Sequence, residues 1–177
     1  MIEGTLVNLR AREVADAGRN ARWWADAEIL SFMGDRYQRS SANSEAFTRT
    51  QSETPMSFEH GCAFAIDTKD GVHIGGMRLF DISPEERSAS LAIMIGERAY
   101  WSKGYGNDAL RTLLRFAFDA MNLRRIELTV FDYNPRAIAA YRKCGFVEEV
   151  RWRQGHYARG AFHDVLVMSV LRDEWRP

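Results

Sequence analysis

The sequence predicts a mixed α+β fold, in which a hairpin-rich first half is followed by a strand–helix–strand–helix–strand unit. Two observations carry this prediction. Short apolar runs separated by turn residues fill the segment 62–95. After that segment, apolar residues at helical spacing alternate with further strand-like runs. The 177 residues fit one domain with a sizeable core, so we expect a single domain over 1–177.

The N-terminal part contains one strand and two helical segments. Alternation of apolar and polar residues predicts a short strand over 5–10. Residues 12–33 are polar and helix-like, with large apolar side chains interspersed. A second helix is expected over 43–53, with Asn43 or Ser44 as its N-cap.

A hairpin follows. Residues 62–68 and 72–80 read as its two strands, because the Lys-Asp-Gly turn between them is a strong hairpin signal. Gly75 and Gly76 lie inside the second strand and predict a bulge or a close approach of backbones.

The rest of the chain alternates strands and helices. Pro135 is well placed as the first residue of a helix, and Gly145 as its C-cap. In order, we expect a turn over 81–87, a strand over 89–95, a helix over 106–121, a strand over 124–131, a helix from Pro135 to Lys143, and strands near 147–153 and 162–171.

Composition excludes several classes of function. Lys+Arg and Asp+Glu both total 24, so no net charge draws the chain to nucleic acid or to an anionic membrane. We expect neither a signal peptide nor a membrane span, since no apolar run approaches roughly 18 residues. Cys62 and Cys144 are far apart, which is typical of a protein of the reducing cytoplasm. The four histidines lack metal-ligand spacing, so no metal site is expected.

Two segments carry the chemistry. Residues 101–109 read WSKGYGNDA, a glycine-rich turn that leads into a helix. Such a turn directs free backbone N–H groups, and the positive end of the helix dipole, at an anion. Residues 134–146 read NPRAIAAYRKCGF and place Tyr141 two helical turns after Asn134 on the same face. Together they predict a site for a phosphate-bearing cofactor, with a phenol near its reactive end.

The glycine turn has two other interpretations. It can be a bare structural turn, or it can belong to a nicotinamide-binding oxidoreductase. Gly104-x-Gly106-x-x-Ala109 fits a loosened dinucleotide-binding fingerprint, and Asp132 ends the next strand like a ribose-binding acid. A dinucleotide fold needs several further strand–helix units, however, and only residues 110–177 remain. The nicotinamide alternative is therefore the weaker one.

These two segments resemble the GCN5-related N-acetyltransferases, and more narrowly their RimJ/RimL-like branch. The family's Q/R-x-x-G-x-G/A motif maps onto Trp101 to Gly106, with Trp101 in place of Gln or Arg. The resemblance implies a twisted, mostly antiparallel seven-stranded sheet in which two strands splay apart near residues 95 and 132 to admit acetyl-CoA. The family's N-x-x-A-x-x-x-Y-x-K-x-G-F segment maps without a gap onto Asn134, Ala137, Tyr141, Lys143, Gly145 and Phe146.

The resemblance also implies a site for acetyl-CoA as cosubstrate and a role for Tyr141. A tyrosine, with its usual pKa of about 10, stays protonated at neutral pH, so Tyr141 is the candidate acid for the leaving thiolate. Cys144 lies beside the site, but no histidine is near it in sequence to activate it as a nucleophile. The implied cofactor-binding residues are Ile93, Met94, Ile95, Trp101, Ser102, Lys103, Gly104, Tyr105, Gly106, Asn107, Asn134, Ala137, Tyr141 and Lys143.

The general base is the weak point of the prediction. Many members of the family carry a Glu where this chain has Ser90. This departure weakens the case for a polyamine acceptor, and it keeps a non-catalytic acyl-CoA-binding domain as an alternative. The remaining candidates for the base, by residue type alone, are His156, His163, Asp81 and Glu85.

The acceptor amine stays open at this stage. A protein N-terminus, a polyamine, an aminoglycoside-like drug and an amino acid all fit, and a homodimer is compatible with the resemblance. The first helices flank the acceptor in this fold. The candidate wall residues are therefore Trp23, Trp24, Phe32 and Tyr37, with core packing as the alternative. The candidate amine-attracting residues are Asp26, Glu28 and Asp35, with a solvated face as the alternative.

Overall fold

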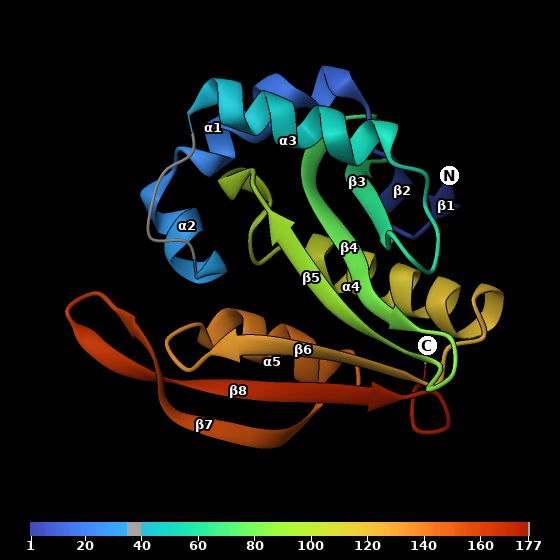
Figure 1. The fold of residues 1–177 in the computed structure, drawn as a ribbon, viewed down its shortest axis with the longest axis vertical. Helices are drawn as coiled ribbons and strands as arrows, with labels where there is room; N and C mark the ends of the chain where they lie inside the picture. The colour runs from blue at the N-terminus through green and yellow to red at the C-terminus, as the bar shows by residue number, and fades with distance from the viewer. Residues whose placement is uncertain (35–39, 177) are drawn as a thin grey trace.

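The computed structural model describes residues 1–34 and 40–176, and these form one eight-stranded sheet flanked by helices (Figure 1). The strand order is β1-β2-β3-β4-β5-β6-β8-β7, and only β5 and β6 pair in parallel among the described strands. The strands are β1 (Ile2–Glu3), β2 (Val7–Ala11), β3 (Cys62–Thr68), β4 (His73–Ser83), β5 (Ser88–Ile95), β6 (Arg125–Phe131), β7 (Val147–Ala158) and β8 (Ala161–Leu171). The helices are α1 (Ala17–Trp24), α2 (Ala27–Met33), α3 (Ser41–Glu53), α4 (Tyr105–Arg115) and α5 (Pro135–Lys143).

The α+β class and the mostly antiparallel sheet are confirmed, but the expected number of seven strands is wrong. The eighth strand is β1, which pairs with β2 through Ile2 and Leu9. Two residues are too few for an alternating pattern to reveal a strand.

The N-terminal helices differ from the prediction in where they begin. The segment 12–33 divides because Asp26 leaves the helical conformation and its carboxylate accepts hydrogen bonds from the N–H groups of Glu28 and Ile29, which starts α2. The N-cap of α3 is Ser40, whose hydroxyl accepts from the N–H of Asn43 at 3.1 Å. The prediction of Asn43 or Ser44 as the cap is therefore wrong.

The β3–β4 hairpin and the close approach at Gly75 are both confirmed. A Cβ on Gly75 would collide with the carbonyl oxygen of Met94 in β5, so only glycine lets the two strands pair there. The expected turn over 81–87 begins later, because β4 continues to Ser83 through an irregular register and a positive φ of 49° at Asp81.

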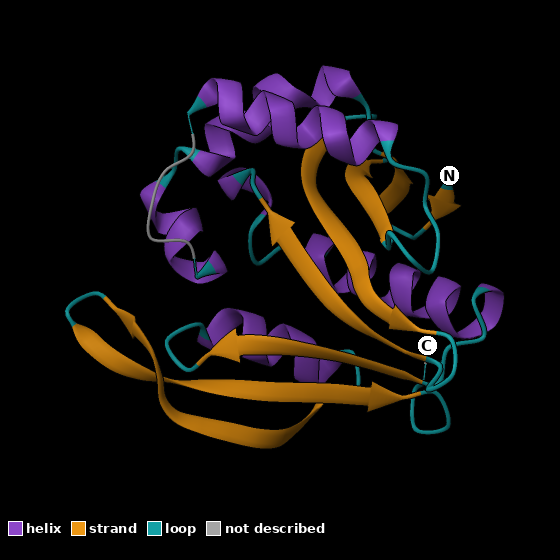
Figure 2. Cartoon of the chain, viewed as in Figure 1, coloured by secondary structure: helices purple, strands orange, loops and turns teal. Residues whose placement is uncertain are grey.

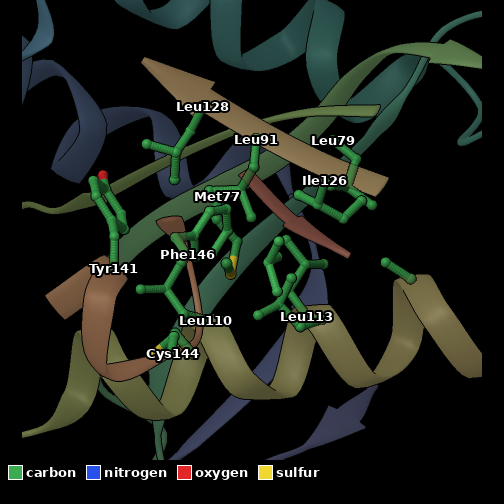
Figure 3. Close-up of a cluster of buried hydrophobic side chains, with 14 of the residues drawn as sticks. Met77, Leu79, Leu91, Leu110, Leu113, Ile126, Leu128, Tyr141, Cys144 and Phe146 are labelled. Carbon is green, nitrogen blue, oxygen red and sulfur yellow. The ribbon is translucent and has the colours of Figure 1, made fainter. Parts of the chain in front are cut away.

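Helices α4 and α5 pass behind the sheet in Figure 1. The apolar face of α4 packs on the sheet, where Leu110 and Leu113 are almost completely buried (Figure 3). Leu114 on the same helix is buried as well. The expected helix over 106–121 ends its α-helical part at Arg115 and continues as a π-helical turn, Phe116–Ala120. Helix α5 has the predicted bounds, and Gly145 follows its C-cap with φ 95°.

Strands β5 and β6 pair along only three residues each and then diverge (Figure 2). Ser88, Ala89 and Ser90 lie opposite Arg125, Ile126 and Glu127. Beyond these pairs, β5 runs to Ile95 and β6 to Phe131 without a shared register, so the predicted splay near residues 95 and 132 is confirmed. No helix in the described part of the chain is long and apolar enough to cross a membrane.

Candidate active site

A cavity of about 770 Å³ lies between the diverging ends of β5 and β6. Side chains alternate between the two faces of a strand, so Leu91 and Leu128 face the helices α4 and α5 while Ser90 and Glu127 face the opposite side. All four line the cavity, which therefore has walls on both faces of the sheet. We call the part next to α4 and α5 the cofactor half. The part next to α2, β7 and the Ser90 face is the acceptor half.

The cofactor half brings most of the expected residues together. Of the residues expected to bind acetyl-CoA, all except Lys103 and Tyr105 line the cavity. Lys103 is exposed, and Tyr105 packs edge-on against Tyr100 with ring centroids 5.0 Å apart. The side chain of Tyr105 therefore packs on Tyr100, while its backbone N–H lies at the start of α4.

The start of α4 offers free backbone donors. Gly104 is the N-cap, with φ 92°, a conformation that glycine adopts without strain. Its carbonyl accepts the first helical hydrogen bond, from the N–H of Asp108 at 2.9 Å. No described side chain caps this end, so the N–H groups of Tyr105, Gly106 and Asn107 remain unpaired by the helix. Such a helix start binds a phosphate.

Trp101, which departs from the family motif, anchors the end of β5. Its indole N–H donates to the carbonyl of Ile95 at 2.6 Å. The guanidinium of Arg136 from α5 lies 3.8 Å from the Trp101 ring centroid, a cation–π contact that connects the two sides of the cofactor half. The motif gave no signal for this pair, because the partner lies 35 residues further along the chain.

Asn134 has the position that its motif indicates. Its side-chain oxygen accepts from the N–H of Ala137 at 3.2 Å and so caps α5. This bond uses only the oxygen, and the side-chain nitrogen makes no hydrogen bond within the described residues. Because Asn134 lines the cavity, that nitrogen is a free donor for a ligand amide carbonyl.

Tyr141 lines the cavity from α5. Its ring packs beside Phe146 at 5.8 Å between centroids, and its hydroxyl points away from the apolar cluster (Figure 3). Only 9% of the residue is exposed. Burial, with a smaller contribution from Cys144, raises the pKa of Tyr141 to about 12. The phenol is therefore held in the protonated form that a general acid requires.

Cys144 is a packing residue. It is 2% exposed and does not line the cavity, and its thiol contacts the carbonyl of Asn107 at 3.7 Å. Burial raises the pKa of this thiol, which suppresses the thiolate that a nucleophile needs.

Of the residues proposed by type as the base, only Asp81 lines the cavity. Glu85, His156 and His163 lie outside it. His163 is close to Asp132, with Nδ1 and Oδ1 3.1 Å apart, and Asp132 also accepts from the backbone N–H of Asp164. The acid that a nicotinamide site would use for a ribose is therefore already occupied.

Sequence reasoning missed Glu127, the second carboxylate that lines the cavity. Glu127 lies opposite Ser90 in the parallel register, so the two side chains emerge side by side on the acceptor face. Its Oε2 accepts from Arg125 at 3.0 Å, while Arg125 is also held by both oxygens of Glu149 at 2.9 and 2.6 Å. A single sequence does not reveal this role, because Ser90 and Glu127 become neighbours only when β5 and β6 pair.

The aromatic residues proposed as the acceptor wall divide into two groups. Phe32 lines the cavity. Trp23 does not, since it is 4% exposed and its indole N–H donates to Glu97 at 3.3 Å. Trp24 packs edge-on against Phe47 and also lies outside the cavity, whereas Tyr37 is outside the described residues. Trp152 from β7, which sequence reasoning did not single out, completes the wall.

The acidic residues proposed to attract an amine are already paired with an arginine. Arg98 contacts Asp26 at 2.7 Å and Glu28 at 2.6 Å, and Asp26 also caps α2. Asp35 lies outside the described residues. Among the residues that the structure describes, the carboxylates that line the cavity are Asp81 and Glu127, and Glu127 also accepts from Arg125. No group of three or more potential metal ligands occurs in the same part of the chain.

Residues 7–147 match the model of the acetyltransferase (GNAT) domain family. The chain belongs to this family. This acetyltransferase is 28% identical to the uncharacterised N-acetyltransferase p20 of Bacillus licheniformis over 171 residues, which cover 96% of this chain and 94% of p20. It is 30% identical to the spermidine N(1)-acetyltransferase of Vibrio cholerae over 112 residues, covering 63% of this chain and 64% of that enzyme.

A solved structure extends the likeness. The spermidine N-acetyltransferase of Vibrio cholerae in complex with CoA and spermine superposes with a TM-score of 0.85 at 25% identity, covering 96% of this chain and 98% of that one. The present chain is thus an acetyl-CoA-dependent N-acetyltransferase. The nicotinamide alternative is wrong, because it requires a largely parallel sheet. The narrower RimJ/RimL-like branch stays a prediction.

Proposed function

We propose that this acetyltransferase moves the acetyl group to a primary amine by direct attack in a ternary complex. The observation that carries the proposal is the continuity of one cavity across the sheet. The cavity contains the helix start at Gly106, the buried phenol of Tyr141 and the carboxylates Asp81 and Glu127. A thioester held from one face and an amine held from the other can therefore meet without a covalent enzyme intermediate.

Backbone groups and Asn134 hold the cosubstrate in this proposal. The free amides at the start of α4 bind the pyrophosphate. The diverging part of β5, Leu91–Ile95, faces no partner strand on its β6 side, so its backbone is available to the amide groups of pantetheine. The side-chain nitrogen of Asn134 supplies a further donor to the same arm.

Two side chains move protons. Glu127 takes a proton from the incoming ammonium, directly or through a water, which leaves a neutral amine. The amine nitrogen attacks the thioester carbonyl carbon, the C–S bond breaks, and Tyr141 gives its proton to the departing thiolate. The nitrogen releases its second proton to water as the amide forms. Glu127 then loses its proton to solvent, and Tyr141 is reprotonated from solvent. The Ser90 hydroxyl cannot act as this base, and the neighbouring Glu127 supplies the carboxylate that can.

A polyamine is a second candidate for the acceptor. Spermidine acetyltransferases are among the relatives, and the carboxylates Asp81 and Glu127 suit a cation. This candidate is weakened because Asp26 and Glu28 lie outside the cavity and bind Arg98, and because Glu127 also binds an arginine, Arg125.

The test is release of free CoA thiol from acetyl-CoA in the presence of a panel of amines, with the Tyr141→Phe variant in parallel. Loss of a general acid should lower kcat by roughly a hundredfold or more, with little change in the KM for acetyl-CoA. Because burial raises the pKa of Tyr141 to about 12, the wild-type kcat should not fall as the pH passes 10, the usual pKa of a tyrosine.

The matched control is Tyr157→Phe. Tyr157 is an exposed tyrosine at 46% that lies outside the cavity, so this change should leave kcat unaltered. Binding of acetyl-CoA without thiol release for any amine would favour the non-catalytic alternative and overturn the proposal.

A further inference from the structure

Two arginines lie beside the acceptor half on the Ser90 face of the sheet. Arg78 belongs to β4, and in the β4–β5 register it lies opposite Ala92, which lines the cavity. Its guanidinium carbon is 4.4 Å from the ring centroid of Phe80, another cavity residue that lies opposite Ser90. A positive charge therefore lies one strand away from the Ser90 position and against a ring that lines the cavity, while Arg78 itself lies outside the lining.

Arg12 brings a second guanidinium to the same face. Gly76 precedes Arg78 by two residues on β4, so both positions lie on the same face of the sheet. A Cβ on Gly76 would be only 2.8 Å from Nη2 of Arg12, so the glycine leaves room for this guanidinium. Burial, and then the charge of Arg78, lower the pKa of Arg12 to about 10. The two guanidinium groups are thus close enough to repel each other.

Neither arginine has a carboxylate partner among residues 1–34 and 40–176. Asp16 is the acid whose charge acts on Arg12, and both oxygens of Asp16 are already held by Arg10, at 2.7 and 2.9 Å. Arg12 itself donates from Nε to the carbonyl oxygen of Phe64 at 3.4 Å. By contrast, Arg98 and Arg125 each bind two carboxylates. Two half-buried like charges without a counter-ion are costly, and an anion on a ligand would relieve the cost.

We infer that the acceptor is a primary amine that also carries an anionic group, a carboxylate or a phosphate, which binds Arg78 and Arg12. The inference rests on the proposed function and adds the substrate class. The acceptor half then has one acidic end, at Asp81 and Glu127, for the ammonium, and one basic end for the anion. Glu127 and Arg78 lie on the strands that flank β5, opposite Ser90 and Ala92 respectively. Their positions are about 7 Å apart along the strands and roughly 10 Å apart across the sheet, a span that two long side chains and a ligand with its two charges a few bonds apart can fill together.

The experiment compares acceptors of equal length that differ in one terminal group. The probes are 5-aminopentanoate, its neutral amide 5-aminopentanamide and the dication 1,5-diaminopentane, with 3-aminopropyl phosphate to distinguish phosphate from carboxylate. For the wild type, kcat/KM for an anionic probe should exceed that for the neutral amide by tenfold or more. The dication should be the poorest acceptor.

Variants assign the preference to its residues. Arg78→Gln should reduce the ratio of anionic to neutral acceptor towards one by raising the KM of the anionic probe. Its kcat with the neutral amide and its KM for acetyl-CoA should stay unchanged. Arg78→Lys should keep part of the preference, since it keeps the charge and loses the planar fork. Arg12→Gln tests the second arginine in the same way, and binding of acetyl-CoA by each variant shows that it is folded.

Two results would overturn the inference alone. One is equal kcat/KM for the anionic and neutral probes, and the other is a clear preference for the dication, which would indicate a polyamine site instead. Failure of all four probes together with failure to bind acetyl-CoA would contradict the proposed function itself.

Discussion

At the scale of single residues, the position of the general base depends on which side chains lie next to each other in the folded sheet. The family resemblance leads us to expect a glutamate at the position of Ser90, and Glu127 lies beside that position on the adjacent parallel strand. Neighbouring strands lie about 4.8 Å apart, so a long side chain or one water molecule can bridge the distance from Glu127 on β6 to the Ser90 position on β5. In the proposed mechanism, Glu127 therefore supplies from β6 the carboxylate that the resemblance places on β5.

Glu127→Gln tests this exchange. Removal of the base should lower kcat/KM for the amine by roughly a hundredfold, with the KM for acetyl-CoA retained. Adding Ser90→Glu to this variant should restore part of the rate. Glu149→Gln is the matched control, because Glu149 shares the partner Arg125 but does not line the cavity. A Glu127→Gln enzyme with the full wild-type rate would show that another group accepts the proton.

At the scale of elements, the start of α4 combines a backbone constraint with a binding function. Gly104→Ala should destabilise the protein by about 1–3 kcal/mol, because φ 92° is strained for alanine. It should also weaken the binding of acetyl-CoA, since it misdirects the amides that follow. Gly71→Ala is the control, because Gly71 has φ 78° in the β3–β4 turn, away from the cavity. Denaturant unfolding and calorimetric titration separate the two effects.

If Gly104→Ala and Gly71→Ala lost equal stability and both retained full affinity for acetyl-CoA, the helix start would be a structural turn and no more. Weaker binding of acetyl-CoA by Gly104→Ala alone would link the φ angle of Gly104 to ligand binding. Full affinity in both variants would show that the two are independent.

Elements encoded by local patterns were predictable, and those that depend on distant partners were not. Both ends of helix α5 were predicted closely, because Pro135 is its first residue and Gly145 directly follows its C-cap, Cys144. Strand β1 was missed because it exists only through pairing with β2. The same distinction holds in the site: the motifs identified Asn134 and Tyr141, whereas Glu127 and Trp152 reach the cavity through tertiary structure alone.

At the scale of the whole molecule, ligand binding should appear as stability. A cosubstrate present at 100 times its Kd should stabilise the folded state by about 2.7 kcal/mol. For a chain of this length that corresponds to a rise in Tm of about 5–10 °C. Acetyl-CoA and CoA should each produce this shift in a thermal unfolding experiment, and NAD and NADP should not. A shift with the nicotinamide cofactors alone would contradict the assignment of the cofactor half.

The cavity walls on both faces of the sheet also bear on the order of events during turnover. In the proposed ternary complex, the thioester lies on the side of α4 and α5, and the amine lies on the side of α2 and Trp152. We therefore expect neither reactant to require prior binding of the other, so that acetyl-CoA and the amine can bind in either order.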